Sequence, residues 1–117
     1  MELEDQVCSF ELAKRLKELG VKQDAYFTWC SSSKGYHLLA PFQFNNFRED
    51  DYSAFSVAEL GEMLRDHLNE YNFTFYGVDG NWVINVYEDT LELVAKTEAD
   101  ARAKMLIYLI ENKKFNP

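Results

Sequence analysis

Several residue types are scarce in this chain of 117 residues, and each shortage excludes a class of protein. Two cysteines, Cys8 and Cys30, do not make a disulfide framework or a structural zinc site. Two prolines and five glycines indicate a folded chain rather than a disordered one. No apolar run approaches the roughly 20 residues that a membrane-spanning helix needs, so we expect no contact with the membrane interior.

A basic leader is also missing. The first five residues, 1–5, are acidic where a secretory signal requires Lys or Arg. We therefore predict a cytoplasmic protein in a reducing compartment, with Cys8 and Cys30 both present as free thiols.

Positive charge is scarce as well, because 12 basic residues face 20 acidic ones and the net charge is −8. This balance disfavours broad attraction to nucleic acid or to an anionic membrane, so we expect neither partner. An acidic surface is compatible with plain solubility, with a basic protein partner, or with imitation of a polyanion.

Apolar and aromatic residues are abundant by contrast. Hydrophobic residues make up 47% of the chain, with nine Phe, seven Tyr and two Trp. Residues 1–117 fit one globular domain, which at this length can bury a core. So many rings exceed the space of a small core, and some of them should lie half-buried at the surface.

Three helices are predicted. The first follows Ser9 as N-cap and ends at Gly20, which is placed to adopt a left-handed conformation. The second begins at the capping box Ser56-Val57-Ala58-Glu59 and should fade near Asn69. The third runs from the N-cap Thr97 to Asn112. Its predicted buried face comprises Ala101, Met105, Tyr108 and Leu109, with Leu106 and Ile110 at the margins.

Two hairpins are predicted between these helices. Residues 25–30 and 36–40 flank a turn at 31–35, and residues 73–78 and 82–87 flank Asp79-Gly80-Asn81. Residues 42–54 lack a period and indicate a long loop, and residues 91–95 fit a short strand or an irregular segment. The order helix, hairpin, helix, hairpin, optional strand, helix predicts an α+β fold. A mostly antiparallel sheet of four to five strands would pack against three helices.

Residues suited to catalysis are few. His37 lies in a predicted strand and His67 on the polar side of the second helix, and neither has the spacing of a metal-binding pair. Cys30 and His37 could meet across the first hairpin as nucleophile and base, but a half-buried thiol and a surface histidine explain the same residues. We expect a protein that is not an enzyme and has no catalytic residues, no metal and no cofactor.

Acidic and aromatic residues near the middle of the chain are the candidate partner contacts. Their carboxylates fit solvated charge, a docking surface for a basic partner, or a divalent-metal site. The candidates are Phe44, Phe47, Glu49, Asp50, Asp51, Glu59, Glu62 and Asp66.

Three segments carry a family resemblance: residues 7–23 (VCSFELAKRLKELGVKQ), 52–64 (YSAFSVAELGEML) and 97–112 (TEADARAKMLIYLIEN). In this order they resemble a family of small uncharacterised proteins carried by phages, prophages and mobile elements of gut-type bacteria. No activity is assigned to that family, so the resemblance implies no catalytic residue. It implies an accessory role, such as modulating a host protein or countering host defence.

Three functional hypotheses follow. The first is a non-enzymatic accessory protein that binds a host or phage protein through its acidic, aromatic-rich surface. The second is an acidic inhibitor that imitates nucleic acid against a nucleic-acid enzyme or a defence system. It requires the acidic candidates to form one continuous surface. The third is a small-molecule or nucleotide-binding domain with a pocket between the sheet and residues 42–54. A homodimer is left open by the sequence.

Overall fold

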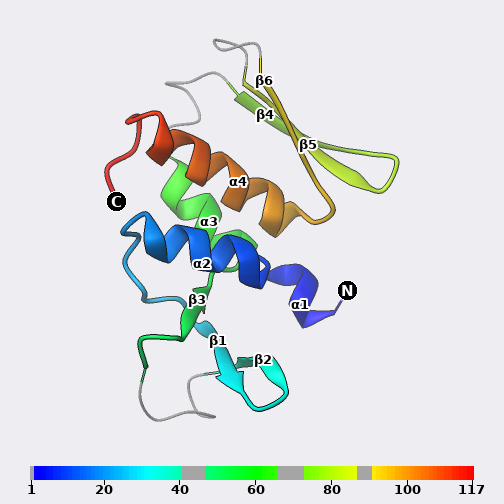
Figure 1. Cartoon of the computed structure of the whole chain (residues 1–117). Coiled ribbons are helices and arrows are strands. Elements are labelled where there is room, and N and C mark those ends of the chain that lie inside the picture. Colours follow the sequence, from blue (N-terminus) through cyan, green and yellow to red (C-terminus); the bar gives the residue numbers. More distant parts are fainter. Residues whose placement is uncertain (1, 41–46, 66–72, 87–90) are drawn as a thin grey trace.

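The computed structural model describes residues 2–40, 47–65, 73–86 and 91–117. These residues form an α+β fold of four helices and six strands, as the sequence predicts for the class (Figure 1). The helices are α1 (Leu3–Gln6), α2 (Phe10–Glu18), α3 (Val57–Leu64) and α4 (Glu98–Glu111). The strands are β1 (Phe27–Ser32), β2 (Gly35–Leu39), β3 (Tyr52–Ala54), β4 (Phe73–Val78), β5 (Asn81–Val86) and β6 (Leu91–Ala95).

The prediction of a single sheet is wrong. The strands form two antiparallel three-stranded sheets, which we call the first sheet (order β2-β1-β3) and the second sheet (order β4-β5-β6). Figure 1 shows the two sheets at opposite ends of the molecule with the helices between them. The physical reason is that each predicted hairpin acquires a third strand of its own instead of pairing with the other hairpin.

The third strand of the first sheet lies in the segment predicted to be a loop. Tyr52 pairs with Trp29, and Ala54 pairs with Phe27. The outer edge of this short strand is closed by a side chain, because the amide oxygen of Gln23 accepts the N–H of Ser53 at 2.8 Å. A strand of three residues is too short to show the period of two on which recognition from sequence depends.

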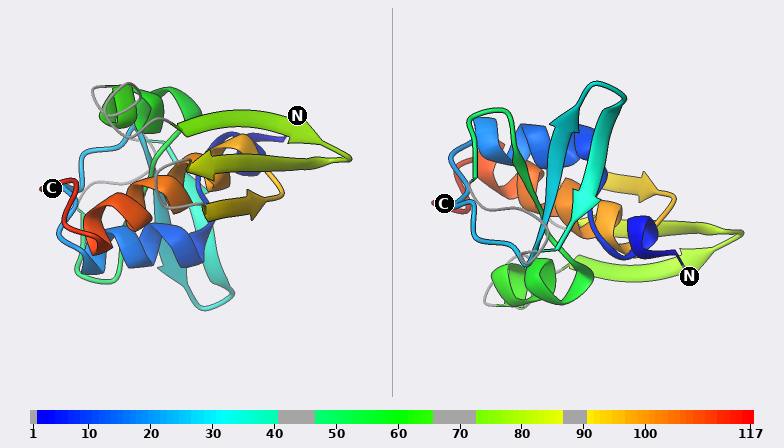
Figure 2. Two further views of the ribbon diagram at one scale, coloured as in Figure 1. Left: turned by 90° about the horizontal axis from the view of Figure 1, so that it is seen from above. Right: turned by 90° about the horizontal axis from the view of Figure 1, so that it is seen from below.

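The second sheet contains the predicted hairpin of β4 and β5, and it shows that residues 91–95 form a strand. Asp79 and Gly80 have φ of 49° and 79°, the left-handed pair that a tight two-residue turn requires. Residues 91–95 form β6, which pairs with β5 along its whole length. The β4–β5 hairpin projects beyond the helices in both views of Figure 2.

The first predicted helix is present as α2, and a short helix precedes it. The acidic residues at the start of the sequence include α1, a helix that was not predicted. Ser9 is the N-cap residue of α2, but its hydroxyl makes no capping bond; its N–H instead donates to Asp100 Oδ1 at 2.7 Å. Gly20 has φ of 92° and ends the helix as predicted, with Val21 N–H donating back to the Leu16 carbonyl.

The predicted caps of the other two helices are confirmed. Ser56 and Glu59 exchange both hydrogen bonds of the capping box at the start of α3. Thr97 Oγ1 accepts the N–H of Asp100 at the start of α4. Asn69, where the second helix was expected to fade, lies outside the described residues.

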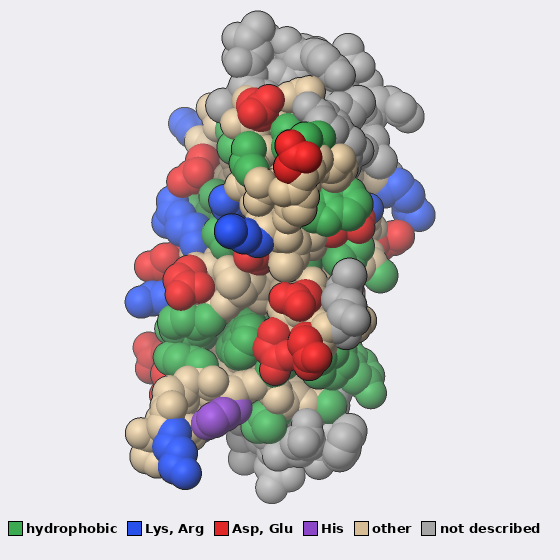
Figure 3. Space-filling view, turned by 90° about the vertical axis from the view of Figure 1, so that its right-hand side faces the viewer, with side chains coloured by type: hydrophobic (Ala, Val, Ile, Leu, Met, Phe, Trp, Pro, Cys, Tyr) green, Lys and Arg blue, Asp and Glu red, His purple; other side chains and the backbone are tan. Residues whose placement is uncertain are grey.

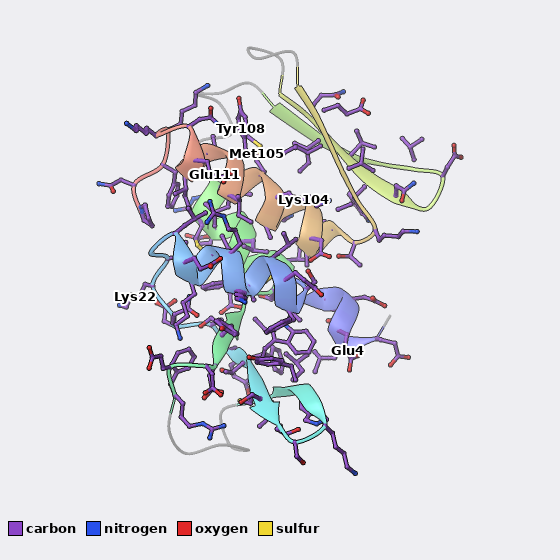
Figure 4. All side chains as sticks on the ribbon, viewed as in Figure 1. Glu4, Lys22, Lys104, Met105, Tyr108 and Glu111 are labelled. Carbon is purple, nitrogen blue, oxygen red and sulfur yellow. The ribbon has the colours of Figure 1, made fainter. Side chains whose placement is uncertain are left out.

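The core gathers around α4, whose buried surface is wider than the sequence predicts. Ala101, Met105 and Leu109 are buried as expected, but Leu106 is fully buried rather than marginal and Tyr108 is only half-buried. Ala99 and Ala103 are buried as well. The reason is that α4 packs against α2 and α3 and also against β5 and β6, so more than one of its faces is covered. Figure 4 shows Met105 and Tyr108 on this helix.

One glycine marks the contact between α3 and α4. Gly61 lies inside α3, where glycine is normally unfavourable by about 0.5–1 kcal/mol relative to alanine. A Cβ at this position would lie 2.3 Å from Arg102 Nη1 of α4. The guanidinium group is held there by Glu98, which accepts hydrogen bonds from Arg102 Nε and Nη2 at 3.0 and 2.6 Å. Glycine therefore makes room for the Arg102 side chain.

This packing predicts an energetic coupling between Gly61 and Arg102. Gly61→Ala should leave the free energy of unfolding unchanged or lower it, because the new methyl group displaces the guanidinium group. In an Arg102→Ala background the same substitution should stabilise the protein by about 0.5–1 kcal/mol. Urea unfolding of the four proteins of this double-mutant cycle measures the coupling. An equal gain in both backgrounds would contradict the proposed packing.

Candidate functional site

The predicted contact residues do not all lie at the surface. Phe44 and Asp66 lie outside the described residues. Phe47 is 41% exposed, and Glu49 and Asp50 are exposed beside it. Asp51, by contrast, is only 1% exposed.

Asp51 is buried because it organises the turn formed by residues 47–51. Its Oδ2 accepts the N–H of Arg48 at 2.8 Å, and its own N–H donates to the Arg48 carbonyl. Ser31 of β1 donates its hydroxyl to Asp50 Oδ2 at 2.6 Å, which holds the pKa of Asp50 below its usual value. Two of the three consecutive acidic residues thus bind their own chain.

Lys17 of α2 fastens this turn to the helices. Its Nζ donates to the carbonyl oxygens of Glu49 and Asp51 at 2.6 and 2.9 Å. The same ammonium group lies 5.0 Å from the ring centroid of Phe47 and 5.1 Å from that of Tyr52. Two aromatic rings of this segment are therefore held near α2 through Lys17.

The acidic candidates on α3 lie elsewhere. Figure 2 shows α3 and the 47–51 turn at opposite sides of the molecule. Glu59 uses both carboxylate oxygens within the protein, accepting the N–H of Ser56 and the N–H of Tyr26. Glu62 is exposed, 3.1 Å from Arg65. With Asp51 buried and Glu59 bonded, the described candidates do not form the continuous acidic surface that imitation of nucleic acid requires.

Glu59 and Glu62 instead border a cleft, which we call the α3 cleft. It has a volume of about 650 Å³ and lies between the segment after α2, the outer side of α3 and the segment after α4. Its walls are Val21, Lys22, Asp24, Phe55, Ala58, Glu59, Glu62, Met63, Phe115, Asn116 and Pro117.

The walls of the α3 cleft combine apolar surface with negative charge. Phe55 and Val21 are buried, whereas Met63 and Phe115 are half-buried and keep part of their apolar surface accessible. Among the described residues of the walls, the charged side chains are the carboxylates of Asp24, Glu59 and Glu62 and the ammonium group of Lys22. Figure 4 shows Lys22 on the segment that follows α2.

A second cleft, the α1 cleft, has a volume of about 770 Å³ and lies beside α1 and the starts of α3 and α4. Its apolar walls include Leu3, Phe27 and Trp82. Its charged residues are balanced, since Lys96 and Arg102 face Asp5 and Glu98, and Glu98 already pairs with Arg102. The charges of its described lining residues therefore sum to zero.

Asp5 of the α1 cleft has further exposed carboxylates near it. Glu4 and Asp5 lie in α1 and Glu2 precedes it, and all three are exposed. Helix α1 lies on the right-hand side of Figure 1, which is the face that Figure 3 shows. In Figure 3 acidic side chains gather at mid-height on this face, with hydrophobic side chains beside them.

The structure places Cys30 opposite His37 in the register of the first sheet, as the catalytic alternative requires. Cys30 is poorly suited to act as a nucleophile, however, because burial and the charge of Asp51 raise the pKa of its thiol. A protonated thiol is a weak nucleophile, and no hydrogen bond joins this pair among the described residues. Burial raises the pKa of Cys8 further, to about 12.

Metal ligands are not assembled in the described part of the chain, where no group of three or more His, Cys, Asp or Glu side chains could hold an ion. None of the described helices has the length and apolar character needed to cross a bilayer.

Comparison with known proteins gives no relative. No family model, no curated protein and no solved structure matches this chain.

Sequence reasoning missed most of the α3 cleft. Asp24, Val21 and Phe115 were not among the candidate contacts, because they follow helices in segments without a motif. Two features of the sequence could have indicated the cleft: the apolar Val21 directly after Gly20, and the aromatic Phe115 after the last helix. Both residues pack against the core.

Lys17→Met should destabilise the protein by about 1 kcal/mol, because the ammonium group that binds the 47–51 turn is lost. Lys14→Met is the matched control, since Lys14 is an exposed lysine of the same helix and should change stability by less than about 0.5 kcal/mol. Chemical unfolding of both variants measures the difference. Equal effects would show that Lys17 does not fasten the turn.

The two thiols should react slowly with iodoacetamide in the folded protein near neutral pH, because burial keeps both protonated. Cys8 should be labelled only as fast as the chain opens. Since its folded pKa of about 12 exceeds the ordinary value of 9.0, the fold should also lose stability as the pH rises from 9.0 toward 12. Mass spectrometry of timed samples follows the labelling, and rapid labelling of Cys8 in the native state would contradict its burial.

Proposed function

We propose that this chain is a non-enzymatic accessory protein of a phage or mobile element that acts in the cytoplasm and binds another protein in the α3 cleft. The phage setting rests on the resemblance of residues 7–23, 52–64 and 97–112 alone. The binding role rests on the cleft, which offers a partner both apolar surface and charge.

The observation that carries the proposal is the composition of the cleft walls. Met63 and Phe115 offer apolar surface whose burial by a partner stabilises a complex by about 25 cal/mol per Å². The carboxylates around them add selectivity, because charged groups at the rim of an interface mainly decide which partner binds. Their negative sign also disfavours phosphate groups, and with them nucleic acid.

A small molecule is the second candidate, because a volume of about 650 Å³ lies within the range of ligand pockets. Thermal unfolding with nucleotides and other small ligands tests this candidate, since a ligand specific for the folded state must raise the apparent stability. A reproducible rise that a cleft variant abolishes would favour it over a protein partner.

Selection of displayed peptides on the immobilised protein tests the protein-binding role. We expect enriched peptides that bind the wild type and lose at least about tenfold in affinity toward Asn116→Trp. Asn116 is exposed and lines the α3 cleft but not the α1 cleft, so a bulky neutral side chain there should fill the α3 cleft without disturbing the core.

Ser33→Trp is the matched control, because Ser33 is exposed in the β1–β2 turn and lines neither cleft. Peptides selected on the wild type should bind this variant normally. Failure to enrich any peptide on the folded protein, or equal binding to both tryptophan variants, would count against the proposal.

A further inference from the structure

We infer that the α3 cleft selects a segment in which an apolar side chain stands next to Lys or Arg, with Glu62 and Asp24 binding the cation. This inference deepens the proposed function and rests on it. Its basis is the arrangement of charge around the apolar walls.

The three carboxylates of the cleft are not equivalent. Glu59 accepts hydrogen bonds through both oxygens, from Ser56 N–H at 2.9 Å and from Tyr26 N–H at 3.0 Å, so its charge is largely satisfied within the protein. Asp24 and Glu62 have side chains that are 61% and 67% exposed. These two carboxylates are therefore the ones that can bind a partner's cation.

Each of these two carboxylates already lies near a cation of the chain itself, and a partner's cation would take the same position. Lys22 Nζ is 4.0 Å from Asp24 Oδ2, and Arg65 Nη2 is 3.1 Å from Glu62 Oε1. Both pairs are highly exposed, and pairs of this kind contribute about 0–1 kcal/mol. A partner's Lys or Arg whose neighbour is buried in the cleft can replace them, because the apolar contact holds it in position.

Apolar surface lies beside Glu62 on α3. Met63 directly follows Glu62 in α3, and Phe115 contributes the facing wall from the segment after α4. A segment that buries an apolar side chain between them brings its neighbouring residue to the acidic rim. The described walls of the α1 cleft carry no such excess of carboxylates, because their charges cancel.

The net charge of the whole protein also favours a basic partner segment. A net charge of −8 attracts basic segments and repels acidic ones before contact, and salt screens this attraction over a distance of about 10 Å or less. Binding in the α3 cleft should therefore depend on salt.

Three fluorescent peptides with the same central leucine and phenylalanine test the inference, one flanked by arginines, one by glutamines and one by glutamates. Fluorescence anisotropy measures their affinities for the full chain. We expect the order arginine, glutamine, glutamate, and a loss of affinity for the arginine peptide when salt rises from about 0.15 to about 0.5 M.

Reversing single charges tests whether the preference for the arginine peptide arises at Glu62 and Asp24. Glu62→Lys and Asp24→Lys should each weaken the arginine peptide by about fivefold and improve the glutamate peptide. Glu92→Lys is the matched control, because Glu92 is an exposed residue of β6 that lines neither cleft. It makes the same change in net charge and should leave the order of the peptides and most of the affinity unchanged.

The outcomes separate this inference from the proposed function. If all three peptides bind equally and Asn116→Trp blocks them, the α3 cleft binds protein segments but the preference for basic ones is wrong. If Glu92→Lys weakens the arginine peptide as much as Glu62→Lys does, net charge acts without the cleft and the inference fails. If neither the three peptides nor any displayed peptide binds, both proposals fail.

Discussion

The close packing of α4 against α2 and α3 is the constraint on which the rest of this structure depends. Ala99, Ala101 and Ala103 are all fully buried in α4, so small side chains face neighbours on more than one side of the helix. Small residues allow neighbouring helices to approach closely. The same helix contacts β5 and β6 of the second sheet, and its Asp100 accepts the N–H of Ser9 at the start of α2. The helical layer that holds the two sheets apart is thus organised around α4.

The α3 cleft is a consequence of this packing. Gly61 lets α3 lie against the Arg102 side chain of α4, which leaves Glu62 and Met63 at the edge of the contact. The opposite wall depends on the end of α4, where Lys113 has φ of 59° and the N–H groups of Lys114 and Phe115 both donate to the Leu109 carbonyl. The chain therefore turns back and places Phe115 against the core. Neither wall is built by a motif that binds a known ligand.

Local features could be predicted because their physical cause lies within a few residues. The capping box of Ser56 and Glu59, the cap Thr97 and the turn at Asp79-Gly80 all satisfy backbone groups next to themselves in sequence. Asp51 shows the opposite case. Three consecutive acidic residues indicate solvated charge, yet Asp51 is buried because a turn closes around its carboxylate and Lys17, 34 positions away, binds its carbonyl.

The amino-acid sequence by itself determined the α+β class, the helix caps, the tight hairpin turn and the acidic character of the protein, because propensity, capping and charge act locally or sum over composition. Tertiary structure alone decided that the strands form two sheets, that β3 pairs with β1, and which carboxylates reach solvent. It also decided that Asp24, Glu62 and Phe115 meet around one cleft. These outcomes depend on contacts between distant segments, and such contacts leave no periodic signal in either segment by itself.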